Sequence, residues 1–169
     1  SKAAGVFGQD TFISGLAANR GMSSPSNLSL RTPYGVHYDG TTLFIADRNN
    51  HRVLGVPVLR AQMANLSARA ATIRLGQALF TTATAGAGNS GINGPESVAI
   101  DPLSGQIAVA DSGNHRVAIA ATPQILTDGT AATLQAALGQ PGLGTNTAGF
   151  GAAQLRNPTL VRGLDGNVF

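Results

Sequence analysis

Two segments of the chain repeat the same patterns at a matching spacing, and this repeat constrains the fold more than any other feature. Pro33–Asp39 and Pro95–Asp101 both read Pro-x-x-Val-x-x-Asp, and Asp47–Val53 and Asp111–Val117 both read Asp-x-x-Asn-His-Arg-Val. A further copy of the first pattern opens at Pro158. Self-similarity of this kind predicts a repeat architecture, in which each copy is one supersecondary unit that stacks on its neighbours.

A second landmark marks the outer end of each unit. An apolar residue, a Gly and a Gln follow one another at Phe7–Gln9, Leu75–Gln77 and Leu138–Gln140. Because these landmarks are in phase with the first two patterns, a chance match is improbable. The chain therefore divides into an outer strand of a preceding unit at 1–9, a first full unit at 10–77, a second at 78–140 and the start of a third at 141–169.

Each full unit is predicted to contain four short strands separated by turn residues such as Asp39-Gly40. Pro57 and Pro123 interrupt strand pairing, and residues 59–70 are good helix formers, so a helical turn between the third and fourth strands is compatible with the sequence. The expected strands are 34–38, 43–46, 52–56 and 71–75 in the first unit and 96–100, 106–110, 116–120 and 133–138 in the second.

The composition agrees with a fold built from strands. Only 11% of the residues are charged, and Glu and Lys, which commonly coat exposed helices, each occur once. The 22 glycines suit a chain with many turns. Repeated four-stranded units are the blades of a β-propeller, so we predict an all-β fold: a partial propeller with two full blades of four antiparallel strands and flanking strands.

These recurring patterns resemble the NHL-repeat family of β-propellers, in a bacterial, long-blade form. The resemblance covers nearly all of residues 5–169. The blades are longer than is usual in the family because the connections that lead into each blade, 10–32, 78–94 and 141–157, are long. The third copy has one extra residue between its Pro and its Asp, which predicts a β-bulge there.

The recurring polar residues are interpreted as structural, because a motif present in every blade cannot mark one unique site. The two Asp side chains are suited to capping the turn that follows them, and the two Arg side chains offer a planar fork for a carboxylate or for carbonyl oxygens. The two His side chains are expected to pack in that turn and not to bind a metal. The residues with these structural roles are Asp47, His51, Arg52, Asp111, Asn114, His115 and Arg116.

Catalysis is not expected, and no cofactor or metal is predicted. Relatives of the NHL fold include metal-dependent amidating lyases and lactonase-like hydrolases, and in the lyases similar to NHL proteins histidines directly follow the first proline of a blade. Tyr34, Glu96 and Thr159 occupy those positions here. A single Glu does not make a calcium site, and His37, which Ala99 replaces in the next copy, is only a minor candidate ligand. The alternative is that the chain is part of a metal-dependent lyase or of a lactonase-like propeller enzyme.

Neither binding to nucleic acid nor a membrane-spanning segment is expected. The formal charge of +3 comes from scattered arginines and few acids, aromatic residues make up 5%, and there is no Trp. RNA binding usually needs clustered basic residues with stacking aromatics. No run approaches the roughly 18 apolar residues of a membrane helix.

The long connections and the turns between the second and third strands should emerge on one face of the blades. That face is predicted to bind a protein or a glycan, which makes the chain a binding or scaffold module, for instance in cell-surface assembly. A deletion of 84–91 is expected to leave the fold intact and to weaken binding. The residues expected on this binding face are Arg48, Asn49, Asn50, Tyr34, Glu96 and Thr159.

The low charge, the absence of Cys and the family resemblance indicate a secreted or cell-surface bacterial protein. Closed propellers contain about four to eight blades. We therefore expect that the rest of the same propeller, in a longer chain, or further copies of the chain complete the ring.

Overall fold

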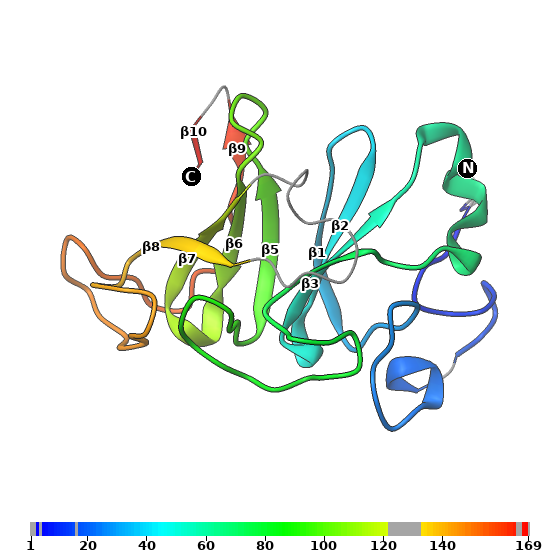
Figure 1. The fold of residues 1–169 in the computed structure, drawn as a ribbon, viewed down its shortest axis with the longest axis horizontal. Helices are drawn as coiled ribbons and strands as arrows, with labels where there is room; N and C mark the ends of the chain where they lie inside the picture. The colour runs from blue at the N-terminus through cyan, green and yellow to red at the C-terminus, as the bar shows by residue number, and fades with distance from the viewer. Residues whose placement is uncertain (1–2, 4, 16, 122–132, 165–166, 169) are drawn as a thin grey trace.

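The computed structural model contains two four-stranded antiparallel sheets that stand side by side (Figure 1). It describes residues 3, 5–15, 17–121, 133–164 and 167–168. The all-β fold and the partial propeller are confirmed. Blade 1 has the strand order β1-β2-β3-β4, with β1 at Pro33–Tyr38, β2 at Thr42–Asp47, β3 at Arg52–Pro57 and β4 at Ile73–Leu75.

Blade 2 repeats this order, and each observed strand begins and ends within about two residues of its predicted position. A short hairpin, formed by β9 at Gly163–Leu164 and β10 at Asn167–Val168, follows it. The four strands of blade 2 are β5 at Pro95–Ile100, β6 at Ile107–Asp111, β7 at Arg116–Ala120 and β8 at Leu134–Leu138.

The helical segments in the described part of the chain are all 3-10 helices. The compatible helical turn after the third strand of blade 1 is present as η3 at Arg60–Ala68, whereas its counterpart in blade 2 falls on 122–132, outside the described residues. The remaining segments are η1 at Ala18–Gly21, η2 at Arg48–Asn50 and η4 at Ser112–Asn114.

The pairing register explains the recurring motif. Asp47 pairs with Arg52 across the turn between β2 and β3, and Asp111 pairs with Arg116 across the equivalent turn of blade 2. Each pair closes a turn made of one 3-10 turn and a His in the left-handed region. The register also shifts within β1 and within β5, at a β-bulge or similar irregularity near the start of each full blade.

The main apolar core lies between the two blades. Alternate residues of a strand face opposite sides of its sheet. Phe44 therefore joins the cluster shared with blade 2, which includes Val98 and Ile107, whereas its neighbour Ile45 faces the other side and packs with Phe7. Burial of each such large apolar side chain contributes about 1.5–3 kcal/mol, so the inter-blade contact is a major source of stability.

The innermost strands of the two blades, β1 and β5, approach closely at Gly35. A Cβ atom at this position would lie 2.6 Å from the carbonyl oxygen of Glu96 and 2.7 Å from the Cα of Ser97. Glycine is therefore needed here for close approach. This contact brings residues at the start of β1 and β5 together.

The long connections lie along the lower and left margins of Figure 1, on the same edge as the η2 and η4 turns. The turns between β1 and β2 and between β5 and β6 lie at the opposite edge (Figure 1). No helix in the described part of the chain is long and apolar enough to cross a membrane. We call the first edge the loop face; it comprises residues 10–32, 78–94 and 141–157 together with η2 and η4.

Candidate functional site

A buried ion pair recurs at the turn of each blade. Arg52 Nε donates to Asp47 Oδ2 at 2.8 Å, and Arg116 Nε donates to Asp111 Oδ2 at 2.7 Å, with all four side chains fully buried. Burial lowers the pKa of the Arg52 guanidinium and raises the pKa of the Asp111 carboxyl. Buried charges are tolerated when their remaining polar atoms are also hydrogen-bonded, so the other contacts of these groups matter.

The remaining N–H groups of Arg52 bind the carbonyls of two different loops. Nη1 donates to Phe80 O at 2.6 Å, in the connection that leads into blade 2. Nη2 donates to Ser26 O at 3.0 Å and to Ser29 O at 2.9 Å, in the connection that leads into blade 1. One buried side chain therefore fixes two successive loops of the loop face.

Arg116 makes the same set of contacts one repeat later. Its Nη1 donates to Leu143 O in the third connection, and its Nη2 donates to Gly88 O and Gly91 O in the second connection, at 3.3 and 2.8 Å. The connection 78–94 is thus held from both sides, by the arginine of blade 1 and by that of blade 2.

The two Asp side chains hold the loops and do not cap the turns. Asp47 Oδ1 accepts the N–H of Arg31 at 2.6 Å, and Asp111 Oδ1 accepts the N–H of Asn93 at 2.7 Å. Neither 3-10 turn has a side-chain cap. The capping role expected from the sequence is therefore wrong, because each carboxylate faces the loop backbone just before the first strand of its own blade.

Asn50 is fully buried, so its predicted place on the binding face is wrong. Its Nδ2 donates to Asp47 Oδ2 and to Asn19 Oδ1, both at 2.8 Å, and the loop folds over it. Asn114, the equivalent residue of blade 2, likewise donates to Asp111 Oδ2 at 2.8 Å, and its loop acceptor is Gly86 O at 2.8 Å. Both side chains bind the loop that leads into their own blade.

The two His side chains link each blade to the next. His51 Nδ1 accepts the N–H of Gly94 at 3.1 Å, and His115 Nδ1 accepts the N–H of Asn157 at 3.2 Å. Gly94 and Asn157 directly precede the first proline of the following copy. An Nδ1 atom that accepts a hydrogen bond carries no proton. Burial, with a further contribution from nearby arginines, lowers the pKa of His51 and so favours this neutral form.

Sequence reasoning found the recurring Gln but assigned it no role. Gln77 Nε2 donates to His51 O at 3.0 Å and to Thr84 O at 2.8 Å, while its Oε1 accepts the N–H of Thr84 at 3.1 Å. Gln140 makes the same three contacts one repeat later. The preceding Gly76 has a φ of 87°, in the left-handed region that favours glycine. The recurrence of the Gly-Gln pair in the sequence was the signal that could have indicated this role.

Three of the predicted binding residues come together where the two blades meet. The Arg48 guanidinium lies 5.1 Å from the centre of the Tyr34 ring, and its Nε lies 3.4 Å from Glu96 Oε1. Arg48 Nη1 also donates to Asn49 Oδ1 at 3.4 Å. Tyr34 is 59% exposed, and the Arg48 and Glu96 side chains are 37% and 14% exposed. Thr159 is exposed at the start of the third copy.

This cluster does not recur. At the positions of Tyr34 and Arg48, blade 2 has Glu96 and Ser112. His37 lies half-buried on β1, and burial lowers its pKa. Within the described residues, no group of three or more His, Cys, Asp or Glu side chains could hold a metal ion. The non-recurring residues are therefore the candidates for a function specific to this chain.

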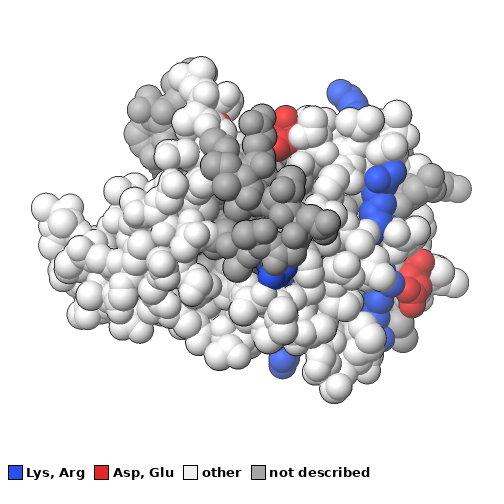
Figure 2. Space-filling view, viewed as in Figure 1, with Lys and Arg blue, Asp and Glu red and all other residues white. Residues whose placement is uncertain are grey.

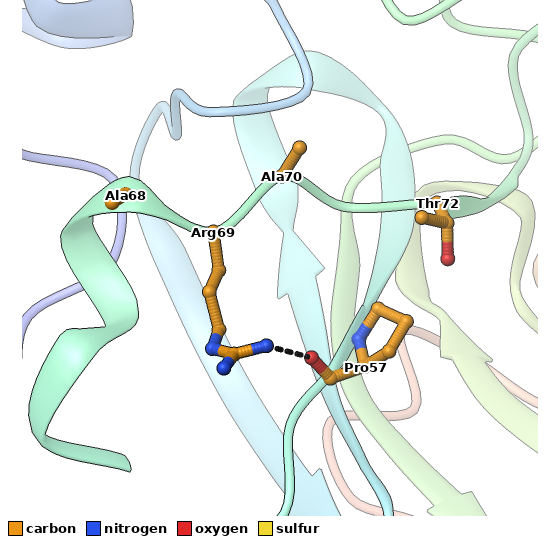
Figure 3. Close-up of a pocket in the computed structure, with 5 residues that line it drawn as sticks. All are labelled: Pro57, Ala68, Arg69, Ala70 and Thr72. Atoms are coloured by element: carbon orange, nitrogen blue, oxygen red, sulfur yellow. Dashed lines mark hydrogen bonds between the residues drawn. The ribbon is translucent and has the colours of Figure 1, made fainter. Parts of the chain in front are cut away.

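A shallow pocket lies beside η3, away from the candidate residues (Figure 3). Arg69 Nη1 donates across it to Pro57 O at 3.4 Å. None of the residues predicted for the binding face lines this pocket. Its lining residues are Pro57, Ala68, Arg69, Ala70 and Thr72.

Four-stranded blades joined by recurring Asp, Asn, His, Arg and Gln contacts define a repeat protein of the propeller class. The NHL-repeat family model matches residues 93–119, which contain β5, β6, η4 and most of β7. Blade 2 therefore contains a recognisable NHL repeat, at residues 93–119. No curated protein shows a significant sequence match to it.

Proposed function

We propose that this chain is a non-catalytic binding module whose loop face holds a partner protein. The observation that best supports this proposal is that the recurring polar side chains hydrogen-bond to the backbone of the long loops. These contacts fix the loops that form this face. A loop that is ordered before binding loses less conformational entropy on binding. NHL repeats are also often used for protein binding.

Each loop of this face exposes a large apolar side chain. Ile13 is 95% exposed in the first connection, Leu79 is 57% exposed in the second, and Phe150 is 85% exposed in the third. Covering each of them with a partner would contribute about 1.5–3 kcal/mol. The polar side chains near this face are better suited to binding than to acid–base catalysis, because the Glu96 carboxylate is held in an ion pair with Arg48.

The test is capture of partners from an extract of the producing cells and from their medium. The loop variant is Ile13→Ser, Leu79→Ser and Phe150→Ser; the control is Leu59→Ser and Leu103→Ser, which are exposed apolar residues away from the loop face. We expect a protein that the wild type and the control retain and the loop variant loses. Equal retention by both variants, or retention of a glycan without protein, would contradict the proposal.

We also propose that further blades, from the same chain or from other copies, cover the open side of blade 1. Val98 of blade 2 is only 4% exposed because it faces blade 1, whereas Val36, its counterpart in blade 1, is 65% exposed. Exposed apolar residues on an uncovered sheet favour association. Val36→Asp should abolish any self-association seen in native mass spectrometry, whereas Leu103→Asp should not.

The low charge and the absence of Cys support a proposed location outside the cell or on its surface. Fractionation of the producing cells tests this proposal. Recovery of the protein in the cytosolic fraction alone would contradict it.

A further inference from the structure

Two arginines of the loop face lie over aromatic rings. The Arg48 guanidinium lies 5.1 Å from the centre of the Tyr34 ring, and the Arg156 guanidinium lies 5.4 Å from the centre of the Phe150 ring. Arg48 belongs to η2, and the second pair belongs to the third connection. A cation–π contact of this kind restrains a guanidinium, while N–H groups that do not face the ring remain open to other partners.

These arginines have N–H groups available for a ligand. Arg48 Nη2 donates to no acceptor in the described part of the chain, and the Arg156 side chain donates no hydrogen bond there. The exposed side chain of Arg31, in the first connection, likewise has no acceptor among the described residues. Each of the three arginines therefore retains donors that a partner can use.

The ion pair of Arg48 is weaker than the structural ion pairs. Its Nε lies 3.4 Å from Glu96, against 2.7–2.8 Å for the two buried pairs of the same chain. Charge-assisted hydrogen bonds are usually about 2.7–2.9 Å long. Glu96 therefore orients Arg48 without saturating it, and a carboxylate of a ligand can make the shorter contact.

The described acidic side chains compete little for these arginines. Asp10, on the loop face, is paired with Arg20, and Glu96, at the start of β5, is paired with Arg48. Asp39 and Asp101 lie in turns at the opposite edge. Basic groups are scattered over a mostly uncharged surface in the view of Figure 2, without a continuous basic stripe. Isolated planar donors suit separate carboxylates better than a polyphosphate backbone, which needs a continuous basic track.

We propose that the loop face recognises an acidic segment of its partner protein, whose carboxylates bind the guanidinium edges of Arg48 and Arg156. This inference rests on the proposed protein-binding function. The guanidinium fork matches a carboxylate with two parallel N–H···O bonds. The neighbouring exposed Phe150 and Tyr34 rings provide apolar contact for the rest of the segment.

The test measures fluorescence anisotropy of a labelled peptide rich in glutamate, with a peptide that has glutamine in place of each glutamate as comparison. We expect the glutamate peptide to bind and the glutamine peptide to bind at least about tenfold more weakly, since a hydrogen bond to a charged group contributes about 1.5–3 kcal/mol. Arg48→Gln and Arg156→Gln should each weaken binding about tenfold. The control variant Arg60→Gln with Arg69→Gln, which removes two positive charges in and beside η3, should change it less than about twofold.

Three results would overturn the inference. They are equal binding of both peptides, an equal loss in the η3 control, or tighter binding of a single-stranded RNA of matched charge. The proposed function has a separate test. If the serine variant of the loop face loses its captured protein while the Arg48 and Arg156 variants keep it, the protein-binding function holds and only the acidic chemistry fails.

Discussion

Replacing Arg116 with Met should lower the free energy of unfolding by about 3–5 kcal/mol, the usual loss when one partner of a buried ion pair is removed. Arg116 is fully buried, its Nε lies 2.7 Å from Asp111 Oδ2, and it also holds carbonyls of two loops. Met keeps the unbranched stem of the side chain and lacks the guanidinium, so the packing of the stem changes little. A domain is typically stable by about 5–15 kcal/mol, so the loss is large enough to measure by urea unfolding.

Most of this loss should come from the Asp111 carboxylate. The loop carbonyls lie near the surface and can be hydrated after the change, whereas Asp111 has no exposed surface. Burial already raises the pKa of Asp111, and removal of the cation would raise it further. A carboxyl with a raised folded-state pKa contributes stability at low pH that is lost as the pH rises through that pKa. The destabilisation should therefore be smaller at acidic pH than at neutral pH.

The double variant Asp111→Leu with Arg116→Met separates charge from packing. Without either charge, no unpaired charge is left buried at this turn, and the double variant should be more stable than Arg116→Met alone. Arg52→Met provides a second measurement of the same contact in blade 1. A loss below about 1 kcal/mol for Arg116→Met, or a double variant less stable than the single one, would refute this reasoning.

Three further outcomes are expected. Because the pKa of His51 is lowered in the folded state, the stability that His51 contributes is present above its ordinary pKa of 6.5 and is lost as the pH falls through the folded-state pKa. Hydrogen exchange of the Gly94 amide should therefore accelerate over that pH range relative to neighbouring amides. Deletion of 84–91, expected from the sequence to leave the fold intact, should lower the unfolding midpoint because it removes acceptors of three buried side chains, Gln77, Asn114 and Arg116. Gly35→Ala should destabilise by about 1–3 kcal/mol, and Gly142→Ala, which has open space around it, should not; thermal unfolding checks both.

The strands could be predicted because their evidence is periodic and local. Pro-x-x-Val-x-x-Asp and Asp-x-x-Asn-His-Arg-Val recur, and the paired Asp and Arg at the ends of the second motif close a turn of fixed length. The loop contacts of Arg52 could not be predicted in the same way. Its acceptors, Phe80 O, Ser26 O and Ser29 O, are backbone carbonyls, which every residue carries, so no side-chain pattern marks them.

Asn50 shows where local reasoning fails at the site. Arg48, Asn49 and Asn50 are consecutive polar residues in a turn, and composition alone places all three at the surface. The 3-10 geometry instead directs them differently: Asn50 faces the buried carboxylate of Asp47, whereas Arg48 lies over the Tyr34 ring. That difference depends on a loop that folds over one side of the turn, through Asn19.

Comparison of the two blades distinguishes residues that the fold requires from residues that are candidates for a specific function. Residues that recur, such as Arg52 and Gln77, hold loops and turns in both blades, so their presence is explained by stability. Tyr34 and Arg48 have no counterpart in blade 2, and the fold evidently forms there without them. A stability requirement therefore does not account for them. The proposed recognition of a ligand would account for them, because an aromatic ring and an oriented guanidinium on pre-ordered backbone are suited to recognition.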